Sequence, residues 1–199
     1  MIYRHALLPG SYDPVTKGHL SLIQRASLFC EKVSACVFVN PQKKCLFSVE
    51  ERASFLALAC KDIPNASAHF HLGMEPEFAE AHGCDIIVKG IRSDVDLAYE
   101  KKIVSDWAIQ NGVDYLLMVG ETDENNGLTI KARYEIKGTS KKTFEMAKGV
   151  PPMLLLTSED SLADISSTAV RTTLKEKEDL SALLAPQTVS AILKAYESK

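Results

Sequence analysis

Short apolar runs alternate with amphipathic helical periods along the first half of this chain. Parallel strands need long crossover connections, usually helices, so this alternation predicts a parallel sheet with helices on both faces. Strands are expected at residues 6–8, 33–39, 68–72 and 85–88, and helices at 19–32, from Ser48 onward, at 75–82 and at 93–110. In the last of these helices, the row Val95, Tyr99, Ile103 and Trp107 is expected to face the core. The expected fold class is α/β with a doubly wound parallel sheet.

Length and charge narrow the classes of protein to which the chain can belong. Its 199 residues suit a single domain with a buried core, expected over 1–199. A formal net charge of −3 does not favour binding to nucleic acid or to an anionic membrane. No run approaches the roughly 18 apolar residues of a membrane span. The five cysteines lack C-x-x-C spacing and no signal-peptide pattern precedes the first strand, so we expect reduced thiols and a cytoplasmic location.

The regular alternation breaks down between residues 111 and 152. An alternating apolar and polar run at 128–137 is typical of a half-buried strand, and Asn126-Gly127 before it is a common hairpin turn. We interpret 111–152 as an inserted β-rich segment of the same domain, favouring an ordered surface addition over a lid or an oligomer contact. Residues 153–157 then resume the main sheet, and two helices close the chain.

A loop of small residues joins the first strand to the first helix. It begins at Pro9-Gly10 and ends at Gly18-His19, where the helix starts. Free backbone amides and the helix dipole make such a junction attractive to an anion, and an imidazole N–H there can donate to a phosphate oxygen. A capping or core role is the alternative for His19. The loop matches neither the G-x-x-x-x-G-K-[ST] nor the G-x-G-x-x-G pattern.

Cationic residues follow two further strands at the sheet edge where Gly10 is expected. Lys43 and Lys44 lie in the loop after the second strand, and Lys89 and Arg92 come after the fourth. The carboxyl ends of parallel strands meet at one edge, so these loops are expected to converge on one cleft with the cations turned towards phosphate. The alternative is that the two lysines of the first loop are simply solvated.

A third group of polar residues begins a later helix at Ser166-Ser167-Thr168. Its hydroxyls and amides can bind a second anion, or Ser166 is merely the helix cap. The expected cleft has many phosphate donors but no evident nucleophile, general base or metal-ligand cluster. This favours a phosphoryl or nucleotidyl transfer in which the substrate's own phosphate attacks, with Mg²⁺ bridging phosphates and taking few protein ligands.

Four segments carry a resemblance to a known family. They are PGSYDPVTKGH at 9–19, NPQKKCLFSVEER at 40–52, VKGIR at 88–92 and ISST at 165–168. In order and spacing the chain resembles the nucleotidyltransferases with an [HT]-x-G-H signature, most closely the bacterial-type pantetheine-phosphate adenylyltransferases. The resemblance implies a Rossmann-like fold and attack of the 4′-phosphopantetheine phosphate on the α-phosphorus of Mg-ATP, yielding dephospho-coenzyme A and pyrophosphate. It also implies a homo-oligomer, usually a hexamer.

The same resemblance implies roles for individual residues. Catalysis is implied for His19, Lys43 and Arg92, with His19 binding ATP and stabilising the transition state. Acceptor binding is implied for Ser11, Lys43, Glu75 and Lys89. ATP binding is implied for Gly10, Ser11, Tyr12, Gly18, His19, Gly90, Ile91, Arg92, Glu100, Ile165, Ser166, Ser167 and Thr168. No protein metal ligand is implied, because magnesium enters with ATP.

Two departures from the family pattern bear on the acceptor. Arginine is usual at Lys89, and an apolar residue is usual near Glu75. The form Ile-Ser-Ser-Thr-x-[IV]-Arg is also common in nicotinamide mononucleotide adenylyltransferases, so a mononucleotide acceptor is the alternative. A third hypothesis, a nucleotide-binding module without catalysis, is opposed by the retention of His19, Lys43 and Arg92 together.

Overall fold

The computed structural model describes residues 3–39, 43–123, 127–146 and 149–199. The strands are β1 (Tyr3–Gly10), β2 (Cys30–Phe38), β3 (Ala66–His71), β4 (Ile86–Ile91), β5 (Tyr115–Asp123), β6 (Gly127–Ile136) and β7 (Met153–Thr157). The helices are α1 (Lys17–Phe29), α2 (Val49–Cys60), α3 (Glu75–His82), α4 (Asp94–Asn111), α5 (Ser167–Glu176) and α6 (Pro186–Glu197), with a 3₁₀ turn at Asp160–Leu162. Within these described ranges, none of the helices is long and apolar enough to cross a membrane.

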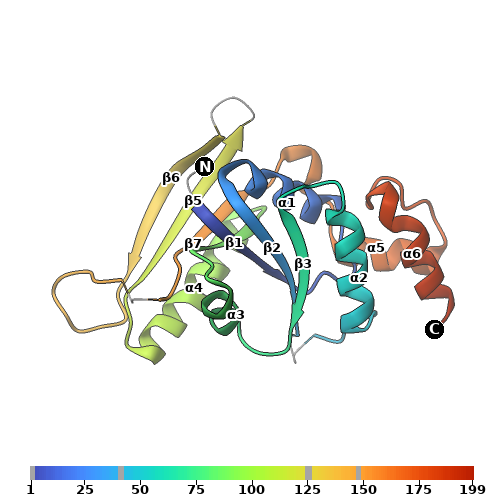
Figure 1. Ribbon diagram of the computed structural model, residues 1–199. Helices are drawn as coiled ribbons and strands as arrows, with labels where there is room; N and C mark the ends of the chain where they lie inside the picture. Colours follow the sequence, from blue (N-terminus) through green and yellow to red (C-terminus); the bar gives the residue numbers. More distant parts are fainter. Residues whose placement is uncertain (1–2, 40–42, 124–126, 147–148) are drawn as a thin grey trace.

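The strands form one sheet in the order β3-β2-β1-β4-β7-β5-β6 (Figure 1). Every neighbouring pair is parallel except β5 and β6. The chain builds outward from β1 to β3 and then returns to place β4 on the other side of β1, so the switch point lies between β1 and β4. The α/β fold expected from the alternation is therefore confirmed.

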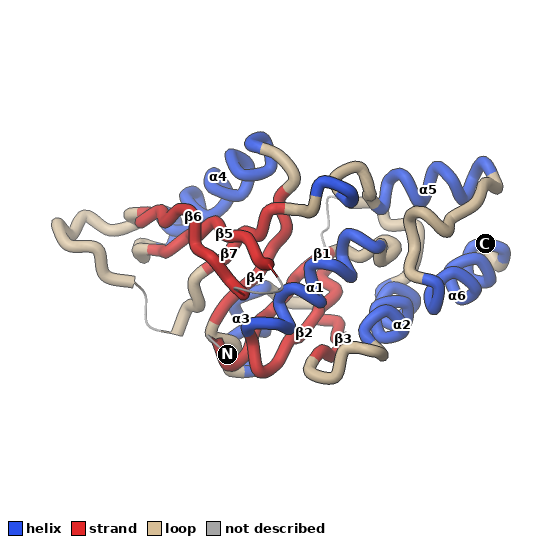
Figure 2. The backbone as a smooth tube through the Cα atoms, turned by 90° about the horizontal axis from the view of Figure 1, so that it is seen from above, coloured by secondary structure: helices blue, strands red, loops and turns tan. Residues whose placement is uncertain are grey.

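Successive residues of the central strands pack alternately into two hydrophobic cores, one on each face of the sheet. Ala6 and Leu8 of β1 pack in one cluster with α1 and α2, whereas Leu7 packs in the other with α3 and α4. Successive side chains of a strand point to opposite faces, so a central strand must be apolar on both. Figure 2 shows the sheet from above, with β6 at one end of the molecule and α6 at the other, as also in Figure 1.

Several helix boundaries follow the capping signals of the sequence. Ser48 accepts from the backbone N–H of Glu51 at 3.2 Å and the Glu51 carboxylate accepts from the Ser48 N–H at 2.7 Å, which confirms the predicted capping box. The first helix ends at Phe29, earlier than the expected 19–32. Pairing of β2 with β1 starts at Cys30. Residues 30–32, which the helical spacing had placed in the helix, therefore belong to the sheet.

The inserted segment expected over 111–152 contributes directly to the main sheet. Its strand β5 pairs in parallel with β7, and Leu117 and Met118 are buried. The strand β6 then pairs antiparallel with β5 at the sheet edge. The turn predicted at Asn126-Gly127 falls partly outside the described residues. Thus β5 is an integral strand, and the expectation of a mere surface addition is wrong for it.

The inward face predicted for α4 is wrong except at Trp107, which packs against the core. Val95 and Tyr99 are 77% and 63% exposed, and the residues buried against the sheet are Val104 and Ala108. Tyr99, Ile103 and Trp107 line a pocket, and of these three Trp107 also packs against the core. An apolar row at four-residue spacing marks a face that meets apolar surroundings, and it does not distinguish a packed core from a binding cavity.

Asp114 anchors the chain that follows β6. Its carboxylate accepts hydrogen bonds from the backbone N–H groups of Gly138, Thr139 and Glu145 at 3.0–3.1 Å, and from the Thr139 hydroxyl at 2.9 Å. These bonds, the one from Glu145 first, lower the pKa of Asp114 to about 2. The carboxylate therefore stabilises the fold at neutral pH, and this contribution is lost as the pH falls from about 4 through about 2.

We expect Asp114→Asn to loosen the segment 138–146, because an amide offers one acceptor oxygen for these four donors. Limited tryptic cleavage after Lys137, Lys141 and Lys142 should accelerate, while Asp62→Asn, an exposed substitution elsewhere, should leave it unchanged. The stability difference between wild type and Asp114→Asn should shrink as the pH falls towards 2. Unchanged cleavage would contradict the anchoring role.

Candidate active site

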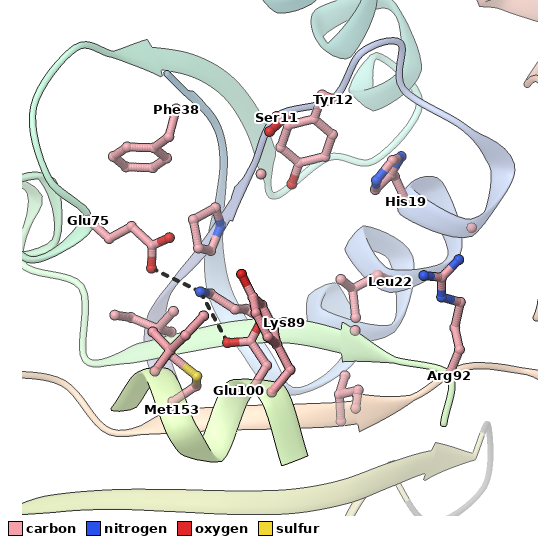
Figure 3. A pocket seen from close by; sticks show the side chains of 18 of the residues that line it. Ser11, Tyr12, His19, Leu22, Phe38, Glu75, Lys89, Arg92, Glu100 and Met153 are labelled. Atoms are coloured by element: carbon pink, nitrogen blue, oxygen red, sulfur yellow. Dashed lines mark hydrogen bonds and ion pairs between the residues drawn. The ribbon is translucent and has the colours of Figure 1, made fainter. Parts of the chain in front are cut away.

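A pocket of about 730 Å³ lies at the carboxyl ends of β1 and β4 (Figure 3). Its walls come from the end of β1, the first turns of α1, the start of α3, the strand β4 and the inner side of α4. Further lining residues come from the ends of β2, β5 and β7, from Lys43 and from residues between 158 and 167. This is the switch point of the sheet, where a parallel α/β fold places ligands.

The pocket gathers nearly all of the residues to which the sequence assigned site roles. Those lining it are Gly10, Ser11, Tyr12, Gly18, His19, Lys43, Glu75, Lys89, Gly90, Arg92, Glu100, Ile165, Ser166 and Ser167. Two others lie apart from its walls. Ile91 is 5% exposed within the core beneath α4, and Thr168 is exposed and accepts a hydrogen bond from Arg171.

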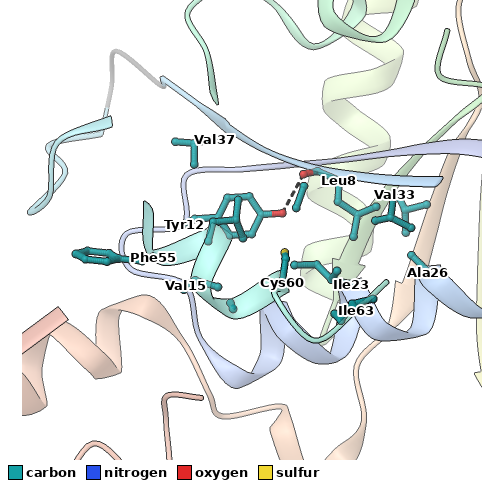
Figure 4. Packing of buried hydrophobic residues seen from close by; sticks show 14 of the residues in the cluster. Leu8, Tyr12, Val15, Ile23, Ala26, Val33, Val37, Phe55, Cys60 and Ile63 are labelled. Carbon is teal, nitrogen blue, oxygen red and sulfur yellow. Dashed lines mark hydrogen bonds between the residues drawn. The ribbon is translucent and has the colours of Figure 1, made fainter. Parts of the chain in front are cut away.

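Tyr12 shapes the turn that leaves β1. Its φ of 47° is left-handed, a strained conformation for a bulky residue, and its buried hydroxyl donates to the Leu8 carbonyl at 2.9 Å (Figure 4). The ring faces His19 with centroids 4.9 Å apart. A Cβ at Gly10 would lie 2.9 Å from this ring, so the glycine makes room for Tyr12. Gly10 therefore has a packing role in addition to the ATP-binding role that the resemblance implies for it.

His19 is held in a defined orientation by the start of α1. Thr16 caps the helix, and its backbone N–H donates to His19 Nδ1 at 3.1 Å. A nitrogen that accepts carries no proton, so the neutral ring is the Nε2–H tautomer. Burial, and then repulsion from Arg92, lower the pKa of His19 to about 4. At neutral pH, His19 therefore presents an uncharged N–H donor to the pocket.

The carboxylate of Asp13 joins two of the loops that line the pocket. One oxygen accepts from the Leu46 N–H at 2.8 Å and the other from the Phe47 N–H at 2.9 Å. The same carboxylate lies 3.5 Å from Arg171 Nη1 of α5. Asp13 is 4% exposed, and charge-assisted bonds of this kind are strong when shielded from water. The loop carrying Lys43 is thereby tied to the loop that precedes His19.

The start of α5 is bound to the same loop. The Ser167 hydroxyl donates to the Pro14 carbonyl at 2.8 Å, and Arg171 Nη1 donates to the Asp13 carbonyl at 2.7 Å. The Ser166 hydroxyl caps α5 by accepting from the Ala169 N–H. All three hydroxyls expected to bind an anion are thus engaged within the protein, because that of Thr168 accepts from Arg171. The backbone amides of the first turn of α5 still provide an anion-binding helix terminus.

The cations of the pocket differ in their surroundings. Lys89 lies within β4 rather than after it, and its Nζ is 3.3 Å from Glu75 and 3.4 Å from Glu100. Burial alone would lower the pKa of Lys89, but the two carboxylates outweigh it and raise the pKa, so the ammonium stays charged. Lys43 is exposed, and Arg92 is half-exposed with its Nε 3.5 Å from Asp96.

Several residues that line the pocket were not predicted from the sequence. Leu22 and Arg25 extend the pocket along α1, and Arg25 donates from Nε to the Thr122 hydroxyl and from Nη1 to the Thr157 carbonyl, both at 2.6 Å. Leu22 and Arg25 lie three and six residues after His19 on the same side of α1, so their spacing in the sequence could have identified them. The apolar end of the pocket includes Phe38, Ile103, Trp107, Tyr115 and Met153. Ile103 and Trp107 belong to the apolar row seen in the sequence, which was expected to face the core.

The donors of the pocket suit phosphate better than a bare metal ion. Across the described ranges, no group of three or more His, Cys, Asp or Glu side chains is arranged to hold a metal. The convergent groups are instead an imidazole N–H, a guanidinium, ammonium groups and the amide end of a helix. Such a set stabilises negative charge on phosphate oxygens.

Comparison with known proteins gives two kinds of relatives. The Cytidylyltransferase-like family profile matches residues 7–173. A phosphopantetheine adenylyltransferase of Leuconostoc citreum is 35% identical over 150 residues, covering 75% of this chain and 93% of its own length. One of Symbiobacterium thermophilum is 47% identical over 95 residues, covering 48% of this chain and 59% of its own length, so this match spans under two thirds of that relative.

Solved structures show a similar fold at low sequence identity. The nicotinic acid mononucleotide adenylyltransferase of Plasmodium falciparum, solved in complex with NaAD, superposes with a TM-score of 0.58. The alignment covers 99% of this chain and 98% of that chain at 16% identity. At this identity the likeness establishes the α/β fold and carries no information on substrate.

We expect Asp13→Ala to reduce the free energy of unfolding by about 2–4 kcal/mol, because it leaves two amides and part of a guanidinium without their acceptor. Urea denaturation followed by circular dichroism measures this. Asp13→Asn, which keeps one acceptor oxygen, should fall between wild type and Asp13→Ala. Asp62→Ala, at an exposed position, is the control and should be neutral. An Asp13→Ala protein as stable as wild type would remove Asp13 from this role.

We expect the His19 ring to titrate near pH 4 in the free protein, as the neutral Nε2–H tautomer above that pH. Its stabilising contribution is lost as the pH falls from about 6.5 to about 4, because the unfolded chain takes up the proton first. Long-range ¹H–¹⁵N correlation spectra measure both. Added ATP should raise the midpoint for His19 and leave His69, outside the pocket, unmoved. A midpoint near 6.5 without ligand would disprove the burial argument.

Proposed function

This chain belongs to the Cytidylyltransferase-like family and, within it, to the phosphopantetheine adenylyltransferases, and from that premise we propose that it transfers the adenylyl group of Mg-ATP to 4′-phosphopantetheine. The products are dephospho-coenzyme A and pyrophosphate. The observation that carries the proposal is the convergence of His19, Lys43, Lys89 and Arg92 on one pocket at the sheet switch point. A volume of about 730 Å³ is within the usual range for small-molecule sites.

The proposed reaction needs no protein nucleophile. An oxygen of the acceptor phosphate forms a bond to the α-phosphorus of ATP, and the bond from that phosphorus to the oxygen bridging to the β-phosphate breaks. The attacking phosphate is already anionic and pyrophosphate leaves as an anion, so no protein base is required. The protein acts by holding the two phosphates in line and by stabilising the charge that develops between them.

Each side chain has a role set by its surroundings. His19 donates its Nε2–H to a phosphate oxygen, in an orientation held by Thr16. Arg92 and the first turn of α5 contact the phosphates of ATP, and Lys43 and Lys89 receive the acceptor phosphate. Ser11 contacts both substrates, with its backbone held by the bond from Arg52 Nη1 to the Ser11 carbonyl at 2.6 Å.

Magnesium belongs to this proposal as part of the substrate Mg-ATP. When bound, it neutralises phosphate charge and holds the phosphate chain in one conformation. It keeps water ligands and phosphate oxygens in such complexes, so it needs few carboxylates from the protein. The pocket fits this arrangement, because its cations and N–H groups are not metal ligands and the metal is then held by phosphate oxygens.

A mononucleotide acceptor is the alternative within the same chemistry. Its support is the form of residues 165–171, and the structural neighbour with that kind of substrate is too distant in sequence to add to it. A nucleotide-binding module without catalysis is opposed by the shared placement of His19, Lys43 and Arg92 in one pocket.

Location and assembly complete the proposal. The five cysteines are free thiols, which supports the reducing cytoplasm as the location. A homo-oligomer, a hexamer by the family resemblance, is supported by exposed apolar side chains at Phe70, Leu72 and Met74.

The test is pyrophosphate release from Mg-ATP with 4′-phosphopantetheine or with nicotinamide mononucleotide as the acceptor. We expect turnover with 4′-phosphopantetheine. His19→Ala should lower kcat by about 10²–10³-fold, the effect of removing one donor to developing charge, with a much smaller change in ATP binding. His69→Ala is the matched control, since His69 lies outside the pocket lining, and it should retain wild-type turnover. Turnover with the mononucleotide alone would overturn the acceptor, and no turnover with either would overturn the enzyme assignment.

A further inference from the structure

The acceptor side of the pocket contains one cation held between two carboxylates. Lys89 Nζ lies 3.3 Å from Glu75 Oε2 and 3.4 Å from Glu100 Oε2 (Figure 3). Two carboxylates against one ammonium leave a net charge of −1. The three side chains are 18%, 32% and 17% exposed for Lys89, Glu75 and Glu100, so water screens their charges only partly.

The strand geometry explains why the three side chains meet. Lys89 is two residues after Ile87, so it points to the sheet face that α3 and α4 cover. Glu75 is the first residue of α3, and Glu100 lies in the second turn of α4. Both helices therefore present a carboxylate to the same ammonium.

The two carboxylates differ in how firmly they are placed. Glu100 is the more buried and belongs to an 18-residue helix. Glu75 is the more exposed and begins an 8-residue helix, after Met74, which is 62% exposed. A ligand that enters the pocket can therefore replace Glu75 at Lys89 at less cost than it can replace Glu100.

We propose that Glu75 competes with the acceptor's phosphate for Lys89, so that an acceptor binds there only by displacing the Glu75 carboxylate. This inference rests on the proposed function for the identity of the acceptor. The ammonium of Lys89 has three N–H donors, and the two carboxylates already engage two of them, so a phosphate bonds fully to Lys89 only when a carboxylate gives way. Glu75 therefore weakens binding of any phosphate at this position, and an acceptor must gain affinity from further contacts elsewhere in the pocket.

The apolar end of the pocket supplies such contacts. Ile103, Trp107 and Met153 line it beside the Lys89 group. An acceptor that carries an apolar or amide arm gains contacts there that inorganic phosphate lacks. The penalty from Glu75 is the same for both ligands, and the complete acceptor offsets it with these contacts whereas free phosphate does not.

The experiment compares Glu75→Gln with wild type in steady-state pyrophosphate release and in calorimetric titration with inorganic phosphate. Glutamine keeps the shape and removes the charge. We expect the KM for 4′-phosphopantetheine and the Kd for inorganic phosphate each to fall about fivefold or more, with the KM for ATP unchanged. Glu80→Gln, an exposed change on the same helix, is the matched control and should behave as wild type.

A double-mutant cycle with Lys89→Met separates competition at Lys89 from a general charge effect. The tightening caused by Glu75→Gln should vanish in the Lys89→Met background, because the contested ammonium is then absent. The proposal is overturned if Glu75→Gln leaves phosphate binding unchanged or weakens it, or if the tightening persists without Lys89. Should wild type release no pyrophosphate with 4′-phosphopantetheine, the proposed function fails, and the phosphate titrations still decide the role of Glu75.

Discussion

The buried carboxylate of Asp13 is the interaction on which the geometry of the pocket depends. It accepts the backbone N–H groups of Leu46 and Phe47 and faces Arg171, while the Asp13 carbonyl accepts a second contact from that same guanidinium. Three segments that are far apart in sequence are held together in this way. The strength comes from charge-assisted bonds in a place that water does not reach, where an unmade bond would be costly. His19 and Lys43 are consequently positioned by a residue that need not touch any ligand.

Electrostatics then divides the pocket into two unlike halves. Around His19, burial and the nearby Arg92 keep the imidazole neutral and leave a guanidinium for phosphate. Around Lys89, two carboxylates already satisfy the cation and leave a net negative charge. In the proposed reaction, one half receives phosphate directly, and in the other a phosphate displaces a protein carboxylate. Adenylyl transfer brings two phosphate-bearing molecules together, so unequal halves offer a way to distinguish them.

Sequence reasoning succeeded where neighbours along the chain decide the outcome. The capping box at Ser48 and the helix Glu75–His82 follow from local spacing and match the structure. It failed where contacts between distant segments decide the outcome. The strand β2 begins at Cys30, inside the predicted helix, because residues from there on pair with β1. The apolar row of α4 lines the pocket at Tyr99, Ile103 and Trp107. The hydroxyl of Ser167 likewise bonds to Pro14 across the fold, which no local pattern indicates.

By itself the sequence determined the alternation of strands and helices, the parallel sheet and the loops that carry the candidate site. These follow from periodicity and capping, which act over a few residues. The tertiary structure alone decided that β5 belongs to the main sheet, that Asp13 ties the loops together, and that Glu75 and Glu100 share Lys89. Each of these depends on which groups meet in space after the chain has folded, where burial makes a contact between distant residues stronger than any preference of the local sequence.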